Sequence, residues 1–258
     1  MLIYAISDIH GYYSKLQNAL KKIDLSVQDS RLIILGDMID VGSDSKRVLE
    51  LIMALEKKYS NQIITLLGNH EEWFISWING EIQSGNYTSY STGIGANTIN
   101  SFISTNEKSR VINSILNDLS IPDEAYLHRI DLKIKEIIVE RYSELINWLL
   151  QKVDDPRYFE TPKQIFVHAG IDEDLGENWK KYSDPFIFTN KFPASLGNFY
   201  KDIISGHIHS NIVANDDSYL GKVFYDGYSH YYIDGNVSKS KEIPVLVYDT
   251  STNIYYTI

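Results

Sequence analysis

Three short runs of β-branched residues near the N-terminus each end in a turn that carries an acid or an amide. Asp8, Asp37 and Asn69 follow these runs and lie 29 and 32 residues apart. This interval matches a strand–helix–strand unit, in which neighbouring strands are parallel. Because the carboxyl ends of parallel strands meet at one edge of a sheet, where ligands bind in open α/β folds, the spacing predicts a site at that edge.

The strand pattern returns in the second half of the chain. Two further runs end at His168 and at Gly206-His207. Short aromatic-rich runs follow, together with a last hairpin around residues 245–248 and 254–256. Their alternation and turn residues predict antiparallel strands of a second sheet.

The strand signal is missing between about residues 80 and 155. Ser, Thr, Asn and Gly are frequent at first, and a helical pattern of Leu145, Ile146 and Leu149 follows. We therefore expect a single domain over residues 1–258, with a helical cap inserted at about 80–155. The tyrosine- and serine-rich stretch 87–93 is typical of a solvated loop, although it could also close over a base or a peptide.

Composition excludes several classes of protein. The chain has 258 residues with 34 acidic and 24 basic side chains and a net charge of −10, which argues against nucleic-acid and anionic-membrane partners. The absence of cysteine excludes disulfides, thiolate nucleophiles and cysteine-ligated zinc. There is no secretory-signal pattern and no run of ~18 apolar residues, so we expect a cytoplasmic protein without membrane spans.

Histidines are concentrated where the strand-like runs end. Five of the seven lie in such turns: His10, His70, His168, His207 and His209. One such histidine is more often a hydrogen-bonded structural residue, but a protein core has little reason to gather five of them beside carboxylates. Oxygen and imidazole donors without thiolates suit manganese, iron or zinc ions. The remaining two, His128 and His230, have no motif around them and are assigned structural roles, and the tryptophans at helical positions are assigned to the core.

Five ordered segments resemble the motifs of a known family. They are Asp8-Ile9-His10-Gly11, Gly36-Asp37-Met38-Ile39-Asp40, Gly68-Asn69-His70-Glu71, His168-Ala169-Gly170 and Gly206-His207. In this order they are similar to the motifs of the calcineurin-like metallophosphoesterases. The likeness is greatest to the phosphoprotein phosphatase branch, which includes bacterial and phage serine/threonine phosphatases and symmetrical diadenosine tetraphosphate hydrolases. We accordingly expect a four-layer αββα sandwich of two mixed β-sheets flanked by helices, with the helical cap inserted.

The resemblance implies two divalent metal ions, with manganese expected and iron or zinc as alternatives. The first ion would be held by Asp8, His10 and Asp37, and the second by Asp37, Asn69, His168 and His207. Asp37 would therefore bridge the two ions. His209 would join the ligands of the first ion, as in the wider superfamily, or else only flank the site. A hydroxide shared by the two ions would attack phosphorus in line.

The resemblance also assigns roles around the leaving group. His70 would be the general acid and Asp40 would fix its tautomer; the alternative for His70 is a structural role beside the metal ions. Asn97 would contact the substrate phosphate or, alternatively, the backbone. Val41 departs from the branch, which carries at this position an arginine that grips the phosphate. Either another cation replaces that arginine, with Arg129, Arg141, Arg157 and Lys180 as the candidates, or the substrate is not an ordinary phosphomonoester.

We expect a phosphoester hydrolase that resembles serine/threonine protein phosphatases. The alternative is a hydrolase of nucleotides or diadenosine polyphosphates, which the missing arginine favours. A third possibility, from another class, is a non-catalytic sensor that binds metal and a nucleotide. The expected partners are a phosphorylated protein or a nucleotide, without nucleic acid or membrane.

Overall fold

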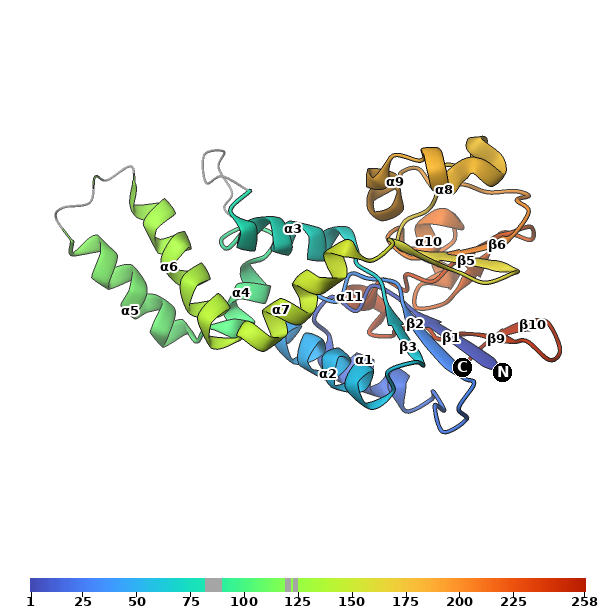
Figure 1. Ribbon diagram of the computed structural model, residues 1–258, viewed down its shortest axis with the longest axis horizontal. Helices are drawn as coiled ribbons and strands as arrows, with labels where there is room; N and C mark the ends of the chain where they lie inside the picture. The colour runs from blue at the N-terminus through green and yellow to red at the C-terminus, as the bar shows by residue number, and fades with distance from the viewer. Residues whose placement is uncertain (82–89, 119–121, 123–124) are drawn as a thin grey trace.

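The computed structural model describes residues 1–81, 90–118, 122 and 125–258, and its strands form two mixed sheets of five strands each (Figure 1). The predicted fold of two mixed sheets flanked by helices is therefore confirmed. In chain order the strands are β1 (Leu2–Ile6), β2 (Arg31–Ile34), β3 (Ile63–Thr65), β4 (Tyr158–Glu160), β5 (Gln164–Val167), β6 (Asp202–Ser205), β7 (Phe224–Tyr225), β8 (His230–Tyr232), β9 (Leu246–Asp249) and β10 (Ile254–Thr257).

The first sheet has the strand order β10-β9-β1-β2-β3, and β1, β2 and β3 are parallel. Alternation along β1 gives this sheet two apolar faces, since successive side chains of a strand point to opposite sides. Ile3 and Ala5 pack toward the second sheet, whereas Tyr4 and Ile6 pack under helices. The C-terminal ends of β1 and β2 lead directly into Asp8 and Asp37.

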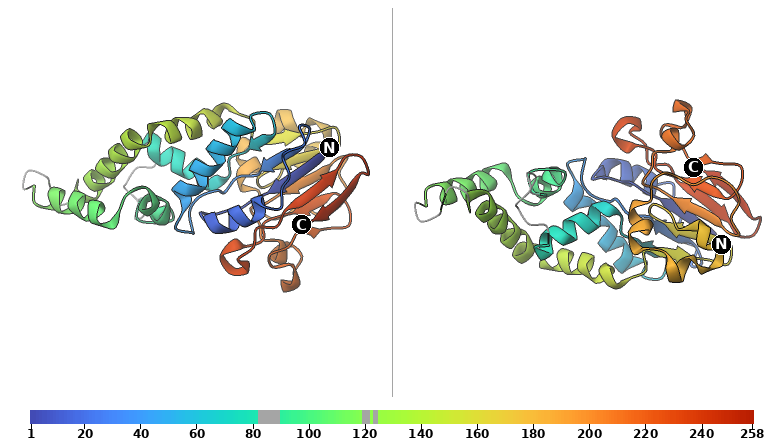
Figure 2. Two further views of the ribbon diagram at one scale, coloured as in Figure 1. Left: turned by 90° about the horizontal axis from the view of Figure 1, so that it is seen from below. Right: turned by 90° about the horizontal axis from the view of Figure 1, so that it is seen from above.

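The second sheet has the strand order β4-β5-β6-β8-β7, with β5, β6 and β8 parallel. Its inner face contributes Phe166, Ile204 and Tyr231 to the apolar layer that it shares with the first sheet. Figure 2 shows the two sheets stacked face to face at one end of the molecule. His168 and His207 follow β5 and β6, so both sheets direct their C-terminal ends to one side.

The prediction that the last hairpin belongs to the second sheet was wrong. The hairpin of β9 and β10 joins the first sheet, where β9 pairs antiparallel with β1, and β8 pairs parallel with β6. An alternating pattern fixes which side chains share a face, but it does not name the partner strand. The backbone groups on the open edge of β1 form hydrogen bonds with β9. The local sequence does not predict this pairing.

Helices cover the outer faces of both sheets. Leu16 of α1, Leu49 of α2, Leu149 of α7 and Val237 of α11 pack in the apolar cluster on the first sheet, and Trp179 and Phe188 cover the second. The helices are α1 (Tyr13–Leu20), α2 (Ser45–Lys58), α3 (Asn69–Asn79), α4 (Ala96–Phe102), α5 (Thr105–Leu116), α6 (Tyr126–Arg141), α7 (Ser143–Gln151), α8 (Trp179–Tyr182), α9 (Pro185–Asn190), α10 (Ser210–Val213) and α11 (Val237–Ser240), with short 3₁₀ turns at Lys152–Asp154, Glu173–Asn178 and Asp217–Tyr219.

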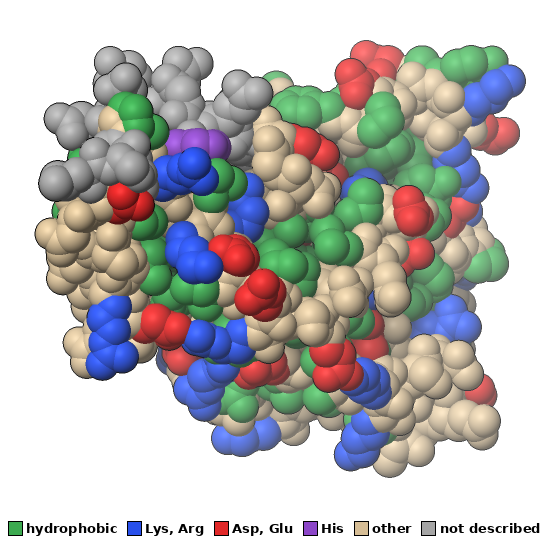
Figure 3. All heavy atoms as spheres, turned by 60° about the vertical axis from the view of Figure 1, so that its left-hand side comes forward, with side chains coloured by type: hydrophobic (Ala, Val, Ile, Leu, Met, Phe, Trp, Pro, Cys, Tyr) green, Lys and Arg blue, Asp and Glu red, His purple; other side chains and the backbone are tan. Residues whose placement is uncertain are grey.

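Helices α4 to α7 form a helical projection that extends to the left in Figure 1, within the range predicted for the cap. Val111 and Ile115 of α5 and Ile134 and Ile138 of α6 are buried in the apolar cluster that also contains the outer face of the first sheet. The i, i+4 spacing places each pair on one helix face. On the end of the projection, acidic and basic side chains are interspersed with apolar ones (Figure 3).

The prediction of a solvated loop for residues 87–93 was wrong for Tyr90 and Ser91, whereas Thr92 is exposed and Gly93 is half-buried. Residues 87–89 lie outside the described residues, but Tyr90 and Ser91 are buried. Their hydroxyl groups donate to the buried carboxylates of Asp40 and Asp131. Composition cannot reveal such partners because they lie far away in the sequence.

Candidate metal centre

One carboxylate oxygen lies at the centre of the site. Oδ2 of Asp37 faces the Nε2 atoms of three imidazoles: His10 at 3.8 Å, His70 at 3.8 Å and His168 at 3.5 Å. Asp37 is 2 % exposed, so this oxygen has little access to water. The residues come from the ends of β1, β2 and β5 and from the start of α3, as expected for a site at the edge of the sheets.

The second sheet completes one side of the site. Oδ1 of Asn69 lies 3.1 Å from Nε2 of His168 and 3.1 Å from Nδ1 of His207. Ligand atoms of Asp37, His168 and His207 all lie within 4.8 Å of one another, which is compatible with one shared ion. Asp37, Asn69, His168 and His207 are therefore gathered in the combination that the sequence predicted for the second ion.

The other side is looser. His10 Nε2 lies 3.9 Å from Oδ1 of Asp8, but the compact group there consists of His10, Asp37 and His70. Asp8 also accepts two contacts from the backbone N–H of His207, at 3.1 and 3.2 Å.

His209 is tied to a different carboxylate. Its Nδ1 lies 2.7 Å from Oδ2 of the buried Asp234, and 40 % of its side chain is exposed. Among the described residues, the compact groups of ligand atoms do not include His209. The sequence analysis gave Asp234 no role, because its contact with His209 is visible only in the fold.

Backbone strain is concentrated at the site. Six residues other than glycine have positive φ angles between 47° and 68° there, namely Asp8, His10, Asp37, Asp40, Val41 and His207. A left-handed conformation costs a residue with a Cβ atom about 1 kcal/mol or more, and it is a real outlier for a β-branched residue such as Val41. Such strain persists where surrounding contacts fix the chain, and it clusters at functional sites.

Two glycines allow the close approach of the ligand-bearing turns. A Cβ atom on Gly68 would lie 2.1 Å from Oδ1 of Asp37, and one on Gly206 would lie 2.1 Å from Oδ2 of Asp8. Both distances are far below van der Waals contact. Any larger residue at either position would push a carboxylate out of the site.

The pKa values of the site show that its charges are not compensated by the protein. Burial, together with Asp234, raises the pKa of Asp8 well above its usual value, and burial with Asp8 and Glu71 does the same for the pKa of Asp37. Burial and neighbouring histidines lower the pKa of His10 to about 4 and that of His168 well below its usual value. Carboxylates that repel one another beside neutral imidazoles form an environment that a cation would stabilise.

The hydrogen bonds of the rings fit metal ligation. Nδ1 of His10 lies 3.0 Å from the carbonyl of Ile39, and Nδ1 of His168 lies 2.8 Å from the carbonyl of Leu35. Since a carbonyl only accepts, the neutral rings carry their proton on Nδ1 and direct the Nε2 lone pair into the site. A backbone carbonyl that fixes the tautomer in this way is the usual support of a metal-binding histidine. The donor set of carboxylates, an amide oxygen and imidazoles therefore fits divalent ions of the manganese, iron or zinc type.

Glu71 is a site residue to which the sequence analysis gave no role. Its fully buried carboxylate accepts backbone N–H groups of Asp37 and Met38, each at 2.8 Å, and of Gly68 at 2.9 Å. It thereby fastens the Asp37 turn to the start of α3. The only indication of this role in the sequence was that Glu71 is the last residue of the motif Gly68-Asn69-His70-Glu71.

His70 is held beside the candidate metal ligands. Its Nδ1 lies 2.8 Å from Oδ2 of Asp40, and its ring packs against Trp73 with centroids 4.7 Å apart. Trp73 was assigned to the core and is in fact partly buried against His70. Trp77 is fully buried, as expected for a core residue.

The side chain of Asn97 contacts backbone in this structure. Its Nδ2 donates to the carbonyl of Val41 at 2.6 Å. Val41 is itself 44 % exposed beside the site.

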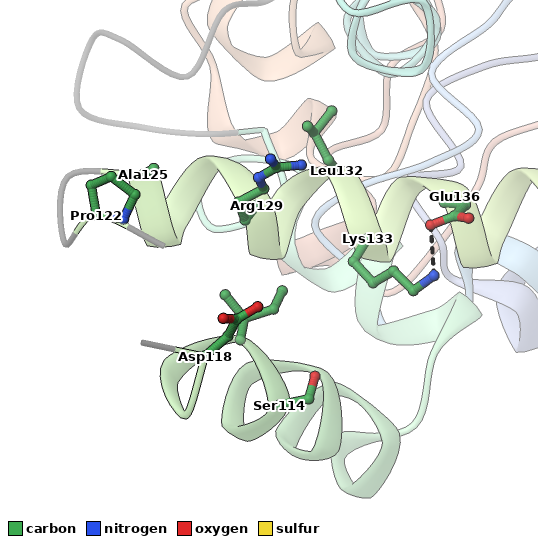
Figure 4. Close-up of a pocket in the computed structure, with 9 residues that line it drawn as sticks. Ser114, Asp118, Pro122, Ala125, Arg129, Leu132, Lys133 and Glu136 are labelled. Atoms are coloured by element: carbon green, nitrogen blue, oxygen red, sulfur yellow. Dashed lines mark hydrogen bonds and ion pairs between the residues drawn. The ribbon is translucent and has the colours of Figure 1, made fainter. Parts of the chain in front are cut away.

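Of the four cations considered as replacements for the missing arginine, three form ion pairs with carboxylates. Arg141 pairs with Glu107, Arg157 with Glu72 and Lys180 with Glu160. Arg129 lines a cleft of about 720 Å³ between α5 and α6, together with Leu132 and the ion pair of Lys133 and Glu136 (Figure 4). Each of the three paired cations already has a carboxylate partner.

None of the helices within the described ranges combines the length and apolar character needed to cross a membrane. The model of the calcineurin-like phosphoesterase family matches residues 1–233. A symmetrical bis(5'-nucleosyl)-tetraphosphatase of Erwinia tasmaniensis is 26% identical over 211 residues, which are 79% of this chain and 58% of the relative. The corresponding protein of Nitrosococcus oceani is 39% identical over 71 residues, 28% of this chain and 24% of its own length.

Two solved structures share the fold. The crystal structure of a putative diadenosine tetraphosphatase has a TM-score of 0.54 and 12% identity, covering 100% of this chain and 92% of the other. A serine/threonine phosphatase from Saccharomyces cerevisiae has a TM-score of 0.54 and 14% identity, covering 100% and 79%. The chain spans less than two thirds of the length of the curated relatives named above. On the family model, which covers most of its length, the chain belongs to the calcineurin-like phosphoesterase family.

Proposed function

We propose that this chain hydrolyses phosphoesters with the help of two divalent cations. The observation that carries the proposal is the convergence of three imidazole Nε2 atoms on Oδ2 of Asp37. One ion would be held by Asp8, His10, Asp37 and His209, and the other by Asp37, Asn69, His168 and His207. When bound, the cations would polarise the phosphoryl oxygens and lower the pKa of a water molecule.

His70 would supply the proton that the leaving oxygen needs. Its Nδ1 is engaged by Asp40, so its Nε2 is the atom that can carry a proton toward a bound phosphoester. Asp40 is fully buried and would hold the ring in one tautomer and orientation. The protein thus brings a proton donor, fixed by a carboxylate, to within 3.8 Å of the central Asp37 oxygen.

A phosphorylated serine or threonine side chain is the first candidate substrate, because the motifs resemble those of bacterial serine/threonine phosphatases. Nucleotides and dinucleoside polyphosphates are the second, and two observations favour them. The sequence relatives bear the name symmetrical bis(5'-nucleosyl)-tetraphosphatase, and the exposed Val41 offers no charge to grip a phosphomonoester dianion.

A single panel of substrates distinguishes these candidates. The manganese-loaded chain and a chelated control would be assayed on a phosphopeptide, diadenosine tetraphosphate, ATP, and aryl phosphate monoesters and diesters. Preference for the phosphopeptide would support the first candidate, and preference for a nucleotide would support the second. A metal-loaded protein inert toward the whole panel would overturn the proposed hydrolysis and favour a binding role.

A further inference from the structure

Two hydroxyl groups converge on the carboxylate that holds His70. Tyr90 and Thr98 each donate to Oδ1 of Asp40 at 2.6 Å. The other oxygen, Oδ2, faces Nδ1 of His70 at 2.8 Å. Asp40 is fully buried, so the protein alone satisfies this carboxylate, and the two hydroxyls fix the plane in which it meets the imidazole.

Tyr90 reaches Asp40 from outside the two sheets. Its ring packs against both Phe74 and Trp77 of α3, with ring centroids 5.8 and 5.9 Å away. Gly95 makes room for it, because a Cβ atom at that position would lie 2.0 Å from the ring. The backbone N–H of Gly95 also donates to the carbonyl of Tyr90 at 3.0 Å. The hydroxyl is therefore aimed by the chain segment that leads into α4.

The same segment is tied to the helical projection. Asp131 of α6 accepts from Nε1 of Trp77 at 2.9 Å and from the hydroxyl of Ser91. Both donors are next to Tyr90: the ring of Trp77 packs against its ring, and Ser91 follows it in the chain. A continuous set of buried contacts thus leads from α6 through Tyr90 and Asp40 to His70.

We propose that Tyr90 is a positioning residue for His70, acting through Asp40, and that it makes the orientation of His70 depend on the placement of the helical projection. This inference rests on the proposed role of His70 as a proton donor. Without the tyrosine hydroxyl, Oδ1 of Asp40 keeps one of its two donors, and the carboxylate can rotate away from Nδ1. His70 then spends less time with its Nε2 directed at the leaving oxygen, which lowers kcat without weakening substrate binding.

Tyr90→Phe tests this directly, because it removes the hydroxyl and keeps the ring packing. Tyr142→Phe is the matched control, since the hydroxyl of Tyr142 donates at 3.0 Å to the carbonyl of Phe102 within the projection and does not reach Asp40. The probes are aryl phosphate monoesters of increasing leaving-group pKa, hydrolysed by the manganese-loaded chain. We expect Tyr90→Phe to lower kcat about tenfold for the poorest leaving group and less for activated ones, at unchanged KM. Tyr142→Phe should leave the kcat values within about twofold of wild type.

A second measurement does not depend on activity. Long-range ¹H–¹⁵N spectra of the metal-free protein report which ring nitrogen of His70 carries the proton. Wild type and Tyr142→Phe should show the Nδ1-protonated form alone, and Tyr90→Phe a mixture of both tautomers. If Tyr90→Phe does not fold, Thr98→Val removes the second donor to the same oxygen and should show the same two signatures.

The inference is overturned if the folded variant keeps a single His70 tautomer, or if its kcat falls equally for all leaving groups. It is also overturned if Tyr90→Phe behaves like Tyr142→Phe while His70→Asn strongly lowers kcat. If His70→Asn itself leaves kcat unchanged, the proposed acid role fails instead, and the spectra still decide whether Tyr90 orients the ring.

Discussion

Within the described part of the chain, histidines are buried beside carboxylates at the candidate metal centre and in a second cluster around His230, and the two clusters differ in how their charges are balanced. In the second cluster, Nδ1 of His230 lies 3.0 Å from Asp226 and its Nε2 lies 3.1 Å from Glu173. Lys191 adds a contact of 2.8 Å to Glu173. Burial alone would lower the pKa of His230, but the bonds to Glu173 and Asp226 raise it overall.

The acids show the same contrast. Burial would raise the pKa of Glu173, but the bonds from His230 and Lys191 lower it to about 2. In the metal centre, by contrast, burial and mutual repulsion raise the pKa of Asp8 and Asp37. In the second cluster, Lys191 and His230 balance the charges of the acids, whereas the candidate metal centre has, among the described residues, no such positive side chain beside Asp8 and Asp37. Burial of histidines and acids therefore does not by itself indicate a metal site; an uncompensated negative charge beside neutral imidazoles does.

The largest effect is expected from Asp37→Asn. The substitution removes the carboxylate oxygen that three histidines face, so kcat should fall by about 10³-fold or more and metal content should drop. Because burial disfavours the charged Asp37, the metal-free variant should be no less heat-stable than metal-free wild type. Steady-state kinetics, elemental analysis and thermal unfolding check the three points.

His230→Gln is the matched control for the other cluster. It removes a buried histidine that has its own carboxylate partners, so metal content should not change and kcat should stay within about threefold of wild type. Equal loss of metal from the Asp37 and His230 variants would remove the distinction between the clusters.

A smaller loss is expected from His70→Asn, which removes a histidine that Asp40 holds beside the candidate metal ligands. We expect kcat to fall by about 10² to 10³-fold with metal still bound, most strongly for poor leaving groups. Rates measured over a series of aryl phosphates test this. An equal loss on every leaving group would contradict a proton-donor role.

Val41→Arg should add the positive charge that the metal centre lacks on its exposed side. A guanidinium binds phosphate with two hydrogen bonds, so KM for aryl phosphate monoesters should fall by about tenfold. The φ angle of Val41 is 56°, which is unfavourable for a β-branched residue, so arginine adds no backbone strain there. Val41→Leu is the uncharged control, and an unchanged KM in the arginine variant would show that the missing charge does not limit monoester binding.

The smallest effect concerns pH and the His230 cluster. Since the pKa of folded His230 is raised, its stabilisation is complete below the unfolded value of about 6.5 and is lost as pH rises through the folded value. Glu173 acts in the opposite range, because its contribution is lost as pH falls toward about 2. The Tm difference between wild type and His230→Gln should therefore shrink between pH 6 and pH 9. Because both proteins contain the candidate metal centre, its titration cancels in the comparison. A Tm difference that does not change with pH would contradict the claim that Glu173 and Asp226 stabilise a charged His230.

The sequence predicted which side chains the fold brings together at the edge of the sheets. Asp8, Asp37 and Asn69 each follow a strand at the interval of a strand–helix–strand unit, and parallel pairing of β1 to β3 follows from that interval. Their proximity at the edge of the sheet could therefore be predicted from the order of the strands, without information on side-chain contacts. His168 and His207 followed by the same reasoning in the second sheet.

What the sequence did not predict depends on partners distant in the chain. The pairing of β9 with β1 joins opposite ends of the chain, and alternation along β9 is compatible with either sheet. Tyr90 was expected in a solvated loop because its partner, Asp40, lies 50 positions away in the sequence. His230 carried no motif, and its role as a structural residue between two acids became specific only with the fold.

Metal stoichiometry is the most direct test of the claim that uncompensated charge marks the site. The chain would be dialysed against manganese and its ions counted per chain for wild type, Asp37→Asn and His230→Gln. Two ions in wild type, fewer in Asp37→Asn and two in His230→Gln are the expected result. No bound ion in wild type, or loss of metal on replacing His230 but not Asp37, would contradict it.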